Sequence, residues 1–96
     1  MDSPFFRLVN ALDAVPCIAG QSSRDLVIGQ LRPAISGAIR YHAQRRLQVI
    51  EILRACLDHQ GGVQELLTIL AELEGDSLPL RRLVETFCEV LPRMGG

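Results

Sequence analysis

The stretch from Ala43 to Gly62 reads AQRRLQVIEILRACLDHQGG and is the longest uninterrupted helical pattern in the chain. With about 100° between successive residues, its apolar side chains gather in one arc of roughly 160°. These are Val49, Ile50, Ile52, Leu53, Cys56 and Leu57. The opposite side holds Gln44, Gln48, Glu51, Arg54 and Asp58. Because this arc is wider than a coiled-coil seam, the pattern predicts a central helix over about 43–59 that several other helices cover.

The remaining segments also repeat apolar residues at helical spacing, and none alternates with the period of two that a strand requires. The expected helices cover about 4–14, 22–32, 62–74 and 78–91. Ser22 with Asp25 resembles a capping box at the start of the second helix. We expect Pro33 to end this second helix and Pro92 to end the last helix.

The segment 33–42 has a weaker pattern and could form one short helical turn or two. Residues 17–20 read as a short apolar connection that ends in a turn. The sequence therefore predicts an all-α fold, a compact bundle of five to six short antiparallel helices.

Length and composition indicate a single globular domain, residues 1–96, with a core over about 4–91. The chain is 48% hydrophobic but has only three Phe, one Tyr and no Trp, so we expect a core of Leu, Ile and Val. A net charge of −1 argues against a nucleic-acid binder of the usual strongly basic kind.

The three cysteines, Cys17, Cys56 and Cys88, are odd in number and each lies in or beside an apolar run. They are typical of buried thiols in a reducing compartment. The first ten residues carry no basic segment before their apolar residues, and no apolar run approaches the about 18 residues of a membrane span. We therefore expect a cytoplasmic protein without membrane contact.

No motif for catalysis or cofactor binding is present in the sequence. Cys56 and His59 lie three residues apart, but a zinc site needs four ligands and the chain offers no second pair. The same two residues could serve nucleophilic catalysis only if Cys56 were exposed and reactive. Gly61 and Gly62 precede a helix without the residues of a phosphate-binding loop. We expect no enzyme activity, no metal, no cofactor and no small-molecule substrate.

The charges are segregated along the chain. Five arginines lie within 32–54, and five acidic residues with no basic one lie within 58–76. Arginine makes two-point hydrogen bonds with carboxylates, so such regions can pair between two molecules. The predicted interface consists of Arg40, Arg45, Arg46, Arg54, Glu65, Glu72, Glu74 and Asp76. The same pattern also fits ordinary solvated helix faces, and both interpretations stay open.

A small helical DNA-binding or transcription-regulatory module is the alternative. The second helix, its turn and residues 35–40 could form a helix-turn-helix. The recognition segment would then be short and would contain Gly37.

Several groups of residues together resemble the bacterial effector-associated domains of the second type, over about 8–91. They are Val9, Ala11, Leu12, Val15, Pro16 and Cys17; Ser23, Arg24, Asp25 and Leu26; Arg54, Ala55, Cys56 and Leu57; Gly61, Gly62 and Leu66; Leu73, Glu74, Gly75, Asp76 and Ser77. The resemblance implies a death-like fold. It also implies a non-enzymatic adaptor that couples an effector or sensor to a partner in a bacterial conflict or immune signalling system. The partner would be a protein with a related helical domain, and self-association is one form of that contact.

Overall fold

The computed structural model describes residues 3–94, and these residues form helices without any strand. The helices are α1 (Pro4–Asp13), α2 (Pro16–Ala19), α3 (Gln21–Gln30), α4 (Pro33–Ser36), α5 (Arg45–Asp58), α6 (Gly62–Glu74) and α7 (Leu78–Met94). The all-α prediction is confirmed. The count exceeds the expected five to six because α2 and α4 are single turns of four residues.

Prolines begin three of these helices. Pro4 follows the N-cap Ser3, whose hydroxyl accepts a hydrogen bond from the Phe6 N–H at 3.1 Å. Pro16 and Pro33 also stand at the first turns of α2 and α4. Proline suits this position because its fixed φ is helical and its missing N–H would have no partner there. Residues 17–20 are thus partly helical, and Pro33 opens a turn that ends at Ser36.

Two boundary predictions were wrong. The N-cap of α3 is Gly20, so Ser22 lies inside the helix and forms no capping box. Pro92 does not stop α7, which continues to Met94. In the last turn of a helix a proline removes only one backbone hydrogen bond, so a helix can end shortly after it.

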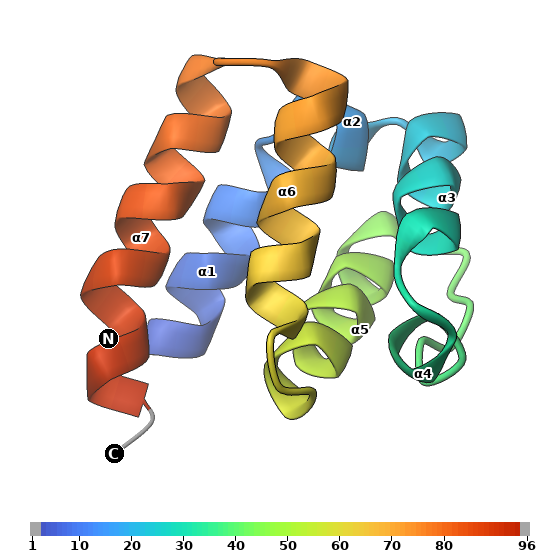
Figure 1. Cartoon of the computed structure of the whole chain (residues 1–96), viewed down its shortest axis with the longest axis horizontal. Helices are drawn as coiled ribbons and strands as arrows, with labels where there is room; N and C mark the ends of the chain where they lie inside the picture. The colour runs from blue at the N-terminus through green and yellow to red at the C-terminus, as the bar shows by residue number, and fades with distance from the viewer. Residues whose placement is uncertain (1–2, 95–96) are drawn as a thin grey trace.

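The helices pack around one core, with α6 in front of α1 and α5 in Figure 1 and with α7 and α3 on either side. Helix α6 contacts α2, α3, α5 and α7, whereas α5 contacts α1, α4 and α6. The centre of the bundle is therefore shared by α5 and α6. Helix α1 connects α7 on one side of the bundle with α2 and α5, because it contacts all three helices.

The core is aliphatic, as the composition predicts. Val49, Ile52 and Leu53 of α5 are fully buried, and Phe87 is the only core aromatic among the described residues. Ile50 and Leu57 are half-buried at the edge of the core. The wide apolar arc of α5 is thus real, but one of its edges, where Ile50 and Leu57 lie, reaches the surface.

Gln48 is the main exception on α5, because the sequence placed it on the solvent face and it is only 3% exposed. Its side-chain oxygen accepts a hydrogen bond from the His42 N–H (2.8 Å), and its amide donates to the Arg40 carbonyl (3.1 Å). The nonhelical segment 37–44 therefore folds back over Gln48. A buried amide is tolerated there because both its oxygen and its nitrogen have partners.

Candidate functional site

The Cys56–His59 pair does not form a reactive site. Cys56 is buried, and burial, followed by the nearby Glu65 carboxylate, raises the pKa of its thiol to about 12. The His59 Nδ1 faces its own helix, 2.7 Å from the Ala55 carbonyl oxygen, to which it can donate. A thiol that is both inaccessible and protonated is a poor nucleophile. Residues 3–94 also contain no group of three or more His, Cys, Asp or Glu that could hold a metal ion.

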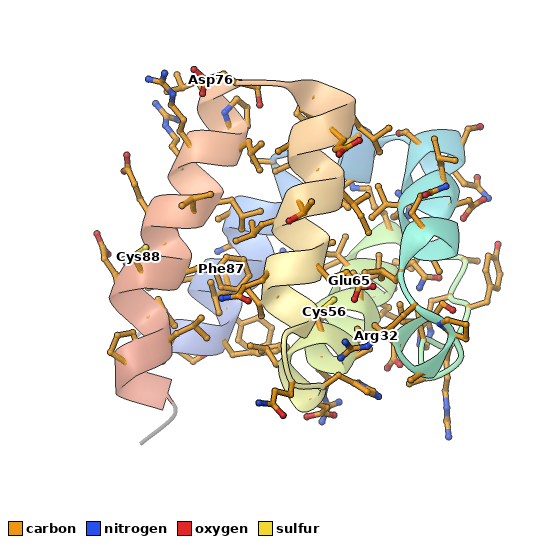
Figure 2. The ribbon with its side chains drawn as sticks, in the orientation of Figure 1. Arg32, Cys56, Glu65, Asp76, Phe87 and Cys88 are labelled. Carbon is orange, nitrogen blue, oxygen red and sulfur yellow. The ribbon has the colours of Figure 1, made fainter. Side chains whose placement is uncertain are left out.

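The other two cysteines differ in exposure. Cys17 is half-buried, and burial, followed by Glu74, raises its pKa to about 11. Cys88 is exposed on α7, so the expectation of three buried thiols is wrong for this residue (Figure 2). Cys88 follows the buried Phe87 and precedes the exposed Glu89, so it lies on the side of α7 that faces away from the core. All three cysteines are free.

Three of the four acidic residues of the predicted interface have partners inside the molecule. Glu65 accepts a hydrogen bond from the Arg32 N–H (2.6 Å) and lies 3.7 Å from the Arg32 guanidinium, near which Figure 2 draws it. Glu74 accepts a hydrogen bond from the Cys17 N–H at 3.2 Å. These two contacts join α6 to the segments around α4 and α2.

Asp76 forms a two-point ion pair with Arg81, with N to O distances of 2.8 and 2.5 Å. The hydrogen bonds and then the charge of Arg81 lower the pKa of the Asp76 carboxyl. The pair joins the link between α6 and α7 to the first turns of α7. Figure 2 shows Asp76 at the top of the bundle. Its exposure means that solvent weakens the attraction.

Glu72 is the remaining acid, and no hydrogen bond or ion pair joins it to another described residue. It lies in a groove of about 280 Å³ between α3 and α6, hereafter the α3–α6 groove. The groove is lined by Leu26, Gln30, Thr68, Ile69, Glu72 and Leu73. Two of its leucines, Leu26 and Leu73, are 49% and 44% exposed.

The four arginines of the predicted interface have different surroundings. Arg45 pairs with Asp13 of α1, with Nε 3.0 Å from Oδ1. Arg46 places its guanidinium carbon 5.8 Å from the centre of the Phe6 ring, a cation–π distance. Arg54 lies beside Asp58 and Ala38 along the exposed side of α5, and Arg40 is exposed in the segment 37–44.

Arg24 has a structural role that was not predicted from the sequence. It is 5% exposed, and its Nη1 donates to the Ile18 carbonyl at 3.0 Å, which ties the end of α2 to α3. A signal for its burial was available in the spacing, because Arg24, Val27 and Leu31 lie three and seven residues apart on one helix face.

None of the helices within residues 3–94 combines the length and the apolar character that a bilayer crossing requires. A family model, effector-associated domain 2, matches residues 9–88. No curated protein and no solved structure is significantly similar to the chain. The match covers most of the chain and includes every helix from α2 to α6. The chain therefore belongs to the effector-associated domain 2 family.

Proposed function

We propose that this domain is a non-enzymatic adaptor of a bacterial conflict or immune signalling system. It couples an effector or a sensor to a partner protein in the cytoplasm, through contacts with a related helical domain. The observation that carries the proposal is the family match over residues 9–88. The death-like arrangement expected from the resemblance belongs to the same proposal.

The surface supports a role in protein binding. Large apolar side chains are exposed beside charged residues in two places, Leu26 and Leu73 around Glu72, and Phe6 beside Arg46. Protein interfaces are enriched in aromatic residues and arginine, and exposed apolar patches with a polar rim often mark them. The three free cysteines are consistent with a reducing compartment.

The geometry does not favour DNA binding. The candidate recognition segment at 35–40 contains only the end of α4, which stops at Ser36. Four helical residues span about 6 Å, too short to lie along a DNA groove and present several side chains to base edges. A titration with duplex DNA at rising salt tests this alternative, because binding to phosphates weakens steeply with salt.

The proposal predicts that reversing the charge of two arginines strongly weakens partner capture. Arg46→Glu with Arg54→Glu suits this test because no ion pair joins either side chain to another described residue. Arg45 is left intact, since a glutamate there would face the largely buried Asp13 and disturb the packing of α1 on α5. We expect capture to fall by about tenfold or more, through lost attraction and added repulsion.

The measurement is capture from host extract on the immobilised domain, followed by mass spectrometry. Proteins that carry an effector-associated domain should bind the parent and be lost from the double variant. Arg82→Glu on α7, a reversal of another exposed arginine, should retain them. The proposal is wrong if the parent captures only nucleic acid, or only proteins without such a domain.

A further inference from the structure

The internal contacts sort the charges of the predicted interface into two groups. Four of the eight residues are engaged inside the molecule, namely Arg45, Glu65, Glu74 and Asp76. The side chains of the other four, Arg40, Arg46, Arg54 and Glu72, make no hydrogen bond or ion pair with another residue among 3–94. Glu72 is thus the one acid of the set that is available to a partner.

The surroundings of Glu72 specify what could bind there. Leu26 and Leu73 flank it with exposed apolar surface, and Gln30 and Thr68 add polar groups along the α3–α6 groove. A partner that fills this groove should bring apolar side chains to cover the leucines. It should also bring a cation to the Glu72 carboxylate, because a carboxylate that loses water without a partner is costly.

The same chain presents such a surface on α1 and α5, hereafter the α1–α5 surface, made of Phe6, Arg46 and the exposed Leu47, which lies about 100° further round α5 than Arg46. Phe6 and Leu47 are 46% and 43% exposed, and the Arg46 guanidinium lies over the Phe6 ring. An arginine held by an aromatic ring keeps its N–H groups available for a carboxylate and loses less side-chain freedom on binding. Ile50, one turn after Arg46, continues the apolar part of this surface.

We propose that a second copy of this chain binds its α1–α5 surface in the α3–α6 groove of the first. Arg46 of one copy then donates two hydrogen bonds to Glu72 of the other, while Phe6 and Leu47 cover Leu26 and Leu73. The proposal rests on the adaptor function and names its contact. The two surfaces belong to different helix pairs, and Figure 1 draws α6 in front of α1 and α5. The contact is therefore head to tail, so it can extend into a ring or a filament.

The test measures self-association by sedimentation at low salt, where charge pairs are least screened. Glu72→Arg and Arg46→Glu should each weaken self-association by about tenfold or more, because each places like charges opposite each other. An equimolar mixture of the two variants should associate again. The Arg46→Glu copy keeps an intact groove, and the Glu72→Arg copy keeps an intact α1–α5 surface. Circular dichroism checks that both variants retain the helicity of the parent.

Glu85→Arg and Arg82→Glu on α7 are matched controls, since both side chains are exposed outside the two surfaces, and both variants should associate like the parent. Three results would overturn the proposal: variants at Glu72 and Arg46 that associate as well as the parent, a mixture no better than its components, or a parent that stays monomeric at about 1 mM. Each of these leaves the adaptor function standing, because that function fails only if no protein with an effector-associated domain is captured.

Discussion

Replacing Leu53 by alanine should lower the free energy of unfolding by about 2–5 kcal/mol, through lost burial and the cavity that remains. Leu53 is fully buried in the middle of α5, where α1 and α6 pack against this helix. A small domain has only about 5–15 kcal/mol of stability in total, so this single change removes a large share of it. Chemical denaturation followed by circular dichroism measures the effect.

Two other leucines of α5 provide matched controls. Leu57 is half-buried, so Leu57→Ala should lower the free energy of unfolding by less than Leu53→Ala does. Leu47 is exposed, so Leu47→Ala should lower it least. This order follows from the burial of each side chain, because the three substitutions delete the same atoms. Equal midpoints for Leu53→Ala and Leu47→Ala would show that the packing of α5 is misassigned.

Replacing Gly62 by alanine should also destabilise the fold, by about 1–3 kcal/mol or more. A Cβ atom at Gly62 would overlap the Cys56 carbonyl oxygen and lie 3.0 Å from the Cys56 Cα. Both of these are backbone atoms, so no side-chain rotation relieves the overlap and α5 must move away from the start of α6. Thermal unfolding of the variant measures the loss.

Gly29→Ala is the control for Gly62, with the opposite expected sign. A Cβ at Gly29 meets nothing within 4 Å, and this glycine lies inside α3. Alanine there should raise stability by about 0.5–1 kcal/mol, because it restricts the unfolded chain and favours the helix. A Gly62→Ala variant as stable as the parent would contradict the close approach of α5 and α6.

The elements that could be predicted from the sequence are those with local signals. Ser3 and Pro4 mark the start of α1, and the glycines at 61 and 75 bound α6. The single turns α2 and α4 were harder to predict, because a proline that ends one helix can also begin the next. Gln48 was placed on the wrong face because its burial depends on how segment 37–44 folds over α5.

The candidate interface was predictable only as a set of charges. Glu65 and Glu72 are seven residues apart and lie on nearly the same side of α6, so the helical period does not separate them. Glu65 is nevertheless paired with Arg32, which the α3–α4 link carries to it, whereas Glu72 has no partner among the described residues. Which charge is available for binding is decided by tertiary packing.

Self-association of this domain can be measured most directly by a nuclear magnetic resonance titration. Unlabelled domain is added to the ¹⁵N-labelled domain up to about 1 mM, and the amide shifts are mapped on the fold. The shifts should concentrate at Leu26 and Leu73 in the α3–α6 groove and at Phe6 and Leu47 on the α1–α5 surface, and should shrink with added salt. An unchanged spectrum, or shifts confined to α7, would contradict the account.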